Sequence, residues 1–207
     1  MIHAEREALA DDLAGIDDDK WRTPSLCSAW SVRDVLGHMT ATARMTPPKF
    51  FLGLARSGFN FNAMTAKDVK RETAGTPQEG LAAFRGLVNA TTHPPGPVDA
   101  MLAEVIVHSE DIRRPLFIIR EYPEASVIRA ADFYKGSNLI VGGKKRIEGL
   151  RLRATDTDWS TGDGPEVTGP AISLLLAIAG RSAALKDLSG AGLDTLAARM
   201  SGKQPVA

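Results

Sequence analysis

The stretch from Val98 to Arg114 constrains the fold more than any other part of the sequence. It predicts a helix that ends before Pro115. Apolar residues stand on nearly every side of this helix, so it has to be buried among other elements. Two ionisable residues, Glu104 and His108, lie within the same buried segment. The apolar residues that surround them are Leu102, Ala103, Val105, Ile106 and Val107.

Helical patterns fill the chain up to about residue 116. Apolar residues recur at helical spacing over 4–16. Ser31, with Asp34 three residues later, is typical of the N-cap of a helix that runs to about Met45. The run Thr76-Pro77-Gln78-Glu79 is the clearest helix start, since it joins an N-cap, an early proline and a glutamate at N3. The other segments expected here are a short amphipathic piece, 48–56, and the loops 21–29 and 92–97.

The pattern changes after residue 116. Residues 149–155 alternate apolar and polar side chains with period two, which indicates a strand. Residues 166–168 are its expected partner across the turn at 162–164. Helices are expected over 124–134, from 170 to about 178, and over 193–200. The sequence therefore predicts an α+β protein, with a helical bundle over 1–116 and a small α/β domain over 117–207.

The composition of the 207 residues limits the kinds of function. Lys+Arg and Asp+Glu both number 25, so no net charge draws the chain to nucleic acid or to an anionic membrane. The single cysteine, Cys27, excludes an internal disulfide framework. The charged N-terminus is unlike a signal peptide, and the longest apolar run, 171–179, is too short to cross a bilayer. We therefore expect a soluble, cytoplasmic protein with small-molecule partners.

The four histidines differ in their surroundings. His3 lies at the N-terminus and His93 lies in a proline-rich loop, where solvated side chains are expected. His38 and His108 lie in expected helices among apolar neighbours. A lone histidine in such a place is most simply a core residue with a satisfied hydrogen bond.

Glu104 makes a metal-binding role of His108 a further hypothesis. The two residues are four apart, so their side chains share one helix face about 40° apart. A carboxylate in an apolar helix needs a partner. Arg113 or Arg114 is one candidate, His108 is another, and a metal ion shared with His108 is the third.

His38 supplies a possible third ligand from a second helix. Gly37 beside it costs about 1 kcal/mol of helix stability relative to alanine, which suggests close backbone packing there. In a bundle, facing helices can bring His38 opposite Glu104 and His108. Two imidazoles and one carboxylate suit Zn²⁺ or another divalent ion with one position left open. Asp111, three residues beyond His108, either orients a ligand imidazole or caps a charge at the surface.

Two stretches of the sequence resemble a known family. Residues 25–39, S-L-C-S-A-W-S-V-R-D-V-L-G-H-M, resemble the element W-(S/T)-V-x-D-(V/L)-x-x-H. Residues 104–111, E-V-I-V-H-S-E-D, resemble the element E-x-x-x-H-x-x-D. Both are similar to the mycothiol-dependent maleylpyruvate isomerase-like proteins, within the DinB-like helical bundle superfamily. Residues 154–181 resemble the small α/β domain that some of these enzymes carry.

The resemblance carries expectations about fold, metal and cosubstrate. It implies an N-terminal DinB-like four-helix bundle followed by a small α/β domain. It also implies a divalent metal, usually zinc, held by His38, Glu104 and His108, and a low-molecular-weight thiol as cosubstrate, mycothiol in actinobacteria. No thiol-binding residue is matched, and the catalytic residues stay unknown. Arg181 either holds an anionic substrate or is a solvated charge at a helix end.

The expected chemistry is that of an activated thiol and an electrophilic substrate. A free thiol is mostly protonated at pH 7, whereas a metal-bound thiol is deprotonated. The same site serves an isomerase or an S-transferase, and with water in place of the thiol it serves a hydrolase. A non-catalytic, ligand-binding bundle is the remaining alternative. Cys27 lacks the surrounding dyad of a catalytic cysteine and is expected to be a small buried residue.

Overall fold

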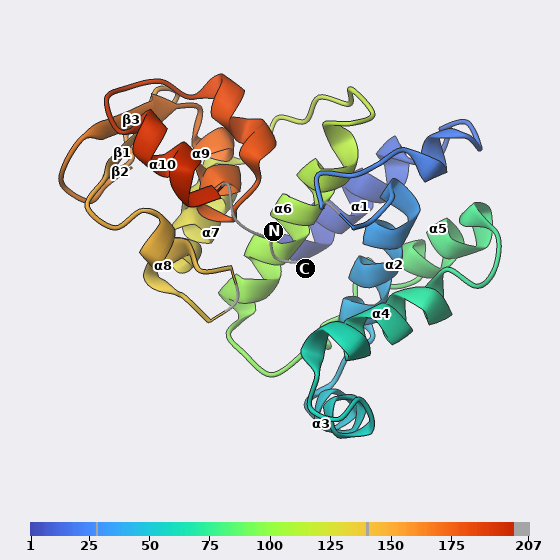
Figure 1. The fold of residues 1–207 in the computed structure, drawn as a ribbon. Coiled ribbons are helices and arrows are strands. Elements are labelled where there is room, and N and C mark those ends of the chain that lie inside the picture. The colour runs from blue at the N-terminus through green and yellow to red at the C-terminus, as the bar shows by residue number, and fades with distance from the viewer. Residues whose placement is uncertain (28, 140, 201–207) are drawn as a thin grey trace. The chain divides into compact units, whose positions relative to one another are not determined.

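The computed structural model describes residues 1–27, 29–139 and 141–200, which form two compact units. The first unit runs from Met1 to Arg120, and the second begins at Glu121 (Figure 1). The predicted division into domains 1–116 and 117–207 stays a prediction. The last seven residues of the second predicted domain, 201–207, lie outside the described residues.

The first unit is helical. Helix α2 packs against α4, α5 and α6, and α1 packs against α5 and α6. Its elements are α1 (Ile2–Asp12), a short 3-10 helix (Lys20–Arg22), α2 (Val32–Ala43), α3 (Pro47–Arg56), α4 (Phe61–Glu72), α5 (Pro77–Arg85) and α6 (Val98–Arg113).

The two predicted capping boxes are present. The Ser31 side chain accepts a hydrogen bond from the backbone N–H of Asp34, and the Asp34 carboxylate accepts from the backbone N–H of Ser31. Thr76 and Glu79 make the same reciprocal pair at the start of α5. These caps satisfy N–H groups that a helix start would otherwise leave unpaired, so they fix where α2 and α5 begin.

Helix α4 is absent from the sequence prediction. Its only local signal is Asn60, whose side chain accepts a hydrogen bond from the backbone N–H of Ala63 at 2.9 Å. The helix packs against α2 at Gly37, where a Cβ would stand 2.8 Å from Thr73 Cγ2. The predicted close packing at Gly37 is therefore confirmed, and α4 is the element that makes it.

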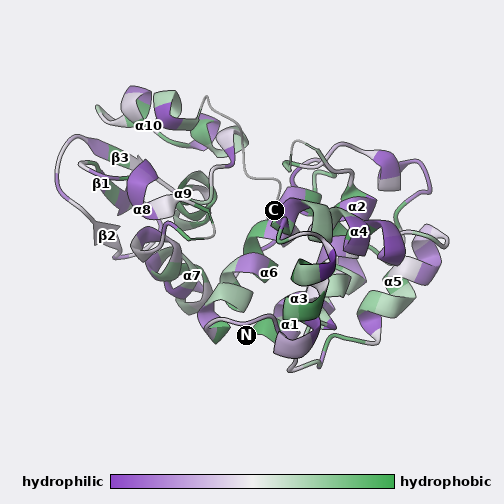
Figure 2. Cartoon of the chain, turned by 60° about the horizontal axis from the view of Figure 1, so that its bottom comes forward, coloured by the Kyte–Doolittle hydropathy of each residue, from purple (hydrophilic) through white to green (hydrophobic). Residues whose placement is uncertain are grey.

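The core of the first unit forms between α1, α2, α5 and α6 and includes Leu9, Leu36, Phe84 and Val105. As predicted, α6 is buried along most of its length, whereas α3 has no buried residue. Figure 2 shows hydrophilic and hydrophobic residues side by side on the other helices of this unit. Helix α6 nevertheless carries buried polar side chains, among them His108, Glu110 and Asp111.

The second unit is a small three-stranded sheet with helices. Strand β1 (Arg151–Ala154) lies between β2 (Ser160–Thr161) and β3 (Glu166–Gly169). The expected pairing of 149–155 with 166–168 is present, but it is parallel, and the hairpin partner of β1 is β2. The helical elements are α7 (Glu124–Gly136), α8 (Gly143–Arg146), α9 (Ala171–Ile178), a 3-10 helix (Ser182–Asp187) and α10 (Leu193–Met200).

The apolar helix of this unit is α9, which packs against α7 and against the sheet strands β1 and β3. All but one of its eight residues are buried, as its sequence suggests. No helix among the described residues combines the length and the apolarity needed to cross a membrane.

Candidate metal centre

Helices α2 and α6 bring the three predicted ligands together. His38 comes from α2, and Glu104 and His108 come from one face of α6. One potential ligand atom from each residue lies within 4.8 Å of those of the other two. His38 Nε2 lies 3.7 Å from Glu104 Oε1, and the two imidazole rings are 4.9 Å apart between centroids.

Glu104 provides the test of whether this group suits a metal. Its Oε1 atom is buried and has no hydrogen-bond partner among the described residues. Ligand atoms about 2.1 Å from a tetrahedral zinc ion lie about 3.4 Å from each other. The 3.7 Å between Oε1 and His38 Nε2 is close to that spacing. Two imidazoles and one carboxylate are also the donors that zinc accepts, so the residues fit a divalent ion.

Of the protein partners that the sequence offered for Glu104, His108 acts on its carboxylate, and Arg6 is a further cation that the sequence did not indicate. Burial raises the pKa of Glu104, against the opposing effect of His108, Arg6 and the side chain of Thr42. Of the two arginines considered, Arg113 donates to Asp12, and Arg114 donates to Glu110.

Arg6 of α1 is a buried cation that acts electrostatically on Glu104. Its guanidinium donates to the backbone oxygen of Ala90 at 2.9 Å. Burial lowers the pKa of Arg6, and the Glu104 carboxylate opposes that shift. No spacing in the sequence signals this electrostatic interaction, because α1 and α6 are distant along the chain. The site therefore has a buried cation on the side of Glu104.

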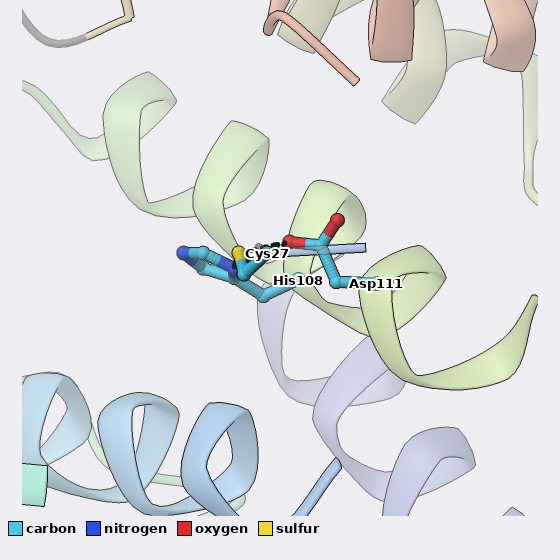
Figure 3. A group of neighbouring side chains, drawn as sticks. All are labelled: Cys27, His108 and Asp111. Atoms are coloured by element: carbon cyan, nitrogen blue, oxygen red, sulfur yellow. Dashed lines mark hydrogen bonds and ion pairs between the residues drawn. The ribbon is translucent and has the colours of Figure 1, made fainter. Parts of the chain in front are cut away.

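His108 is held from behind by Asp111 and Cys27 (Figure 3). Its Nδ1 atom lies 2.8 Å from Asp111 Oδ2, and the Cys27 thiol donates to the same oxygen at 3.0 Å. Burial lowers the pKa of His108, but the contacts of its own ring with Asp111 and Cys27 outweigh burial and raise that pKa to about 10. Figure 3 shows the other ring nitrogen of His108 on the far side of the ring. Asp111 is fully buried, so its alternative role as a surface cap is wrong.

Trp30 forms a wall of the site. Its ring centroid lies 5.0 Å from that of His38 and 6.4 Å from that of His108. In the sequence, Trp30 is a residue of the family-like element and a possible hydrophobic staple before the Ser31 N-cap. Its position immediately before the N-cap of α2 is what carries the indole to both imidazoles.

The other singled-out residues lie apart from this group. His3 is exposed, and His93 lies beside the backbone oxygen of Pro94. Arg181, which follows α9 in the second unit, is buried and donates to the backbone oxygen of Ala179. The expectation of a solvated charge at Arg181 is therefore wrong, and its contact with an anionic substrate stays untested.

Residues 2–100 match the sequence model of the Mycothiol maleylpyruvate isomerase N-terminal domain. This segment includes His38 and ends before Glu104 and His108. No curated protein matches the sequence.

Two solved structures are similar to the chain along almost its whole length. They are crystal structures of the mycothiol-dependent maleylpyruvate isomerase, at TM-score 0.58 and 12% identity, and of a histidine-to-alanine mutant, at TM-score 0.63 and 13% identity. Each comparison covers 99% of this chain and 92% of the other chain. The helical unit followed by the small sheet is thus the fold of those structures.

Proposed function

We propose that the chain is a metal-dependent enzyme that uses a low-molecular-weight thiol, because its residues 2–100 match the model of the mycothiol maleylpyruvate isomerase N-terminal domain. Mycothiol is the thiol that the family description names, and it is the cosubstrate that we propose. The observation that carries the proposal is the convergence of His38, Glu104 and His108, with Glu104 Oε1 buried and without a hydrogen-bond partner among the residues that the structure describes. Three protein ligands leave one position of a tetrahedral ion for a substrate atom.

Each residue of the site has a distinct task in this proposal. A divalent ion, zinc most simply, would supply a deprotonated sulfur at neutral pH, because it lowers the pKa of a bound thiol. His38, Glu104 and His108 hold the ion, and Glu104 offsets its charge. Asp111 keeps the His108 ring in place through Nδ1, so that Nε2 remains for the ion. Trp30 covers one side of the imidazoles and limits the access of water there.

The thiolate of the cosubstrate is the nucleophile of the proposed reaction. It adds to one carbon of a conjugated double bond, and the electron pair moves into the conjugated carbonyl group. Rotation about the new single bond followed by elimination returns the thiol and gives the isomer. If the adduct takes up a proton and leaves, the reaction is an S-transfer. The site residues serve both outcomes in the same way.

The experiment begins with metal analysis of the purified chain and three variants. We expect about one divalent ion per chain in the unmodified protein and in His93→Ala, which changes a loop histidine outside the site. His38→Ala and His108→Ala should each lose the ion while keeping the far-UV circular dichroism of the unmodified protein. Equal metal content in all three variants would contradict the proposed ligands.

A second measurement distinguishes thiol use from hydrolysis. Co²⁺ replaces the native ion, and mycothiol is added while the visible and near-ultraviolet spectra are recorded. A new sulfur-to-cobalt charge-transfer band that saturates with mycothiol supports the proposal. A cobalt spectrum that mycothiol does not change would reject a thiol cosubstrate and leave water as the reacting ligand.

A further inference from the structure

Cys27 has no task in the proposed function, yet it lies directly behind the site. It belongs to the loop before α2 and is buried, at 2% exposure. Two clusters of side chains have the spacing to hold a metal ion. One consists of His38, Glu104 and His108, and the other of Cys27, His108 and Asp111. His108 is thus the member that the two groups share. The Cys27 sulfur lies near Nδ1 of the His108 ring, the nitrogen that also faces Asp111.

The Cys27 thiol and the His108 ring meet at one atom. Asp111 Oδ2 accepts from Cys27 Sγ at 3.0 Å and lies 2.8 Å from His108 Nδ1. The sulfur itself lies 3.8 Å from Nδ1, so the thiol and the ring approach the oxygen side by side (Figure 3). A carboxylate with two donors on one oxygen has less freedom to turn than one with a single donor.

The loop that carries Cys27 is fastened to α6 and to itself. The backbone N–H of Leu26 donates to the backbone oxygen of Asp111 at 3.2 Å, so the loop meets Asp111 through both backbone and side chain. The Ser25 hydroxyl accepts from the backbone N–H of Cys27 at 3.1 Å and donates to the backbone oxygen of Trp30 at 2.7 Å. The thiol is therefore held in place before any metal binds.

We propose that Cys27 is a positioning residue, whose thiol holds the Asp111 carboxylate against His108 and thereby fixes the ring nitrogen that the metal uses. The inference rests on the proposed function, because it takes His108 to be a metal ligand. Partners behind a ligating histidine orient the ring, and their loss weakens metal affinity by about 10-fold to 100-fold. Cys27 acts on the His108 ring indirectly, through its hydrogen bond to Asp111.

The first test needs no metal. In the metal-free chain with ¹⁵N-labelled histidine, we expect the Nδ1-bound proton of His108 to exchange slowly with water. Cys27→Ala should speed that exchange, because Asp111 loses one of the donors that hold it. Cys27→Ser keeps a donor and should restore slow exchange. Equal exchange in all three proteins would overturn the proposal.

The second test is a double-mutant cycle on Co²⁺ affinity. Cys27→Ala should weaken binding about 10-fold, the low end of the effect of losing such a partner, and Cys27→Ser should recover most of that loss. If Cys27 acts through Asp111, then Cys27→Ala should cause no further loss in an Asp111→Ala background. Thermal unfolding of each variant separates lost packing from lost affinity.

Each outcome of the cycle decides the question. Losses that simply add would show that Cys27 does not act through Asp111, and equal losses in the alanine and serine variants would show that volume alone matters. If Asp111→Ala does not fold, the exchange rates of the Cys27 variants still decide. If neither the unmodified protein nor any variant binds Co²⁺, the proposed function fails. The proton-exchange rates still show separately whether Cys27 restrains the Asp111 carboxylate.

Discussion

Replacement of Gly37 by alanine tests the close packing of α2 on α4. In an open helix interior, this change stabilises a protein by about 0.5–1 kcal/mol, because alanine loses less backbone entropy on folding. At Gly37 the new Cβ would stand 2.8 Å from Thr73 Cγ2, well inside van der Waals contact. Thr73 cannot turn away freely, since its hydroxyl donates to the backbone oxygen of Val69 at 2.9 Å. Overpacking of this kind costs about 1–3 kcal/mol.

The two effects leave a net loss of about 1 kcal/mol for Gly37→Ala, measured as the free energy of unfolding in urea followed by far-UV circular dichroism. Gly80→Ala is the matched control, because Gly80 lies in α5 with nothing within 4 Å of the added Cβ. That variant should gain about 0.5–1 kcal/mol. Thr73→Ser removes the obstructing methyl group and keeps the hydroxyl, so it should restore stability when combined with Gly37→Ala.

The reasoning would be refuted if Gly37→Ala were as stable as the unmodified protein or more so. It would also be refuted if Thr73→Ser failed to reduce the cost of Gly37→Ala. His38 follows Gly37 in the chain, so the same variant should displace a proposed ligand and lower Co²⁺ affinity relative to Gly80→Ala.

The remaining predictions concern a cap, the core and one acidic side chain. Ser31→Ala should cost about 1 kcal/mol in urea unfolding, because α2 loses its capping box; an unchanged midpoint would contradict this. Phe84→Ala should cost about 3–5 kcal/mol by the same assay, since Phe84 is fully buried, and a loss typical of a surface position would contradict it. Burial acts to raise the pKa of Asp132, but hydrogen bonds from Lys135 and Trp159 outweigh it and hold that pKa below its ordinary 3.8. The folded state thus gains stability from ionised Asp132 above pH 3.8 and loses it as the pH falls lower, so the melting-temperature deficit of Asp132→Asn should shrink in acid. An equal deficit at neutral and acid pH would contradict this assignment.

The sequence predicted best those features that local chemistry decides. The capping boxes at Ser31 and Thr76 and the buried helix α6 follow from residues within a few positions of one another. Helix α4 escaped prediction because its residues are mostly polar and only three of them are buried. Its stability depends on packing against α2, which the local sequence does not reveal. The parallel direction of β3 likewise depends on the path of the chain between strands.

The same distinction holds for the candidate site: local spacing predicted its ligands, but not the residues around them. Glu104 and His108 share a helix face by spacing alone, and a facing helix was enough to expect His38 nearby. The surrounding contacts join segments that lie far apart in the chain. Cys27 contacts Asp111 from the loop before α2, and Arg6 of α1 acts electrostatically on Glu104. Sequence spacing carries no signal for either interaction, because tertiary packing alone brings these residues near each other.

The indole of Trp30 gives the chain an optical probe of its own. Its ring lies beside both imidazoles, so the fluorescence of this side chain should respond to any ion or small molecule that reaches them. A paramagnetic ion seated there would quench the emission strongly. Candidate substrates can therefore be screened by titration without a chemical label and before any turnover assay exists.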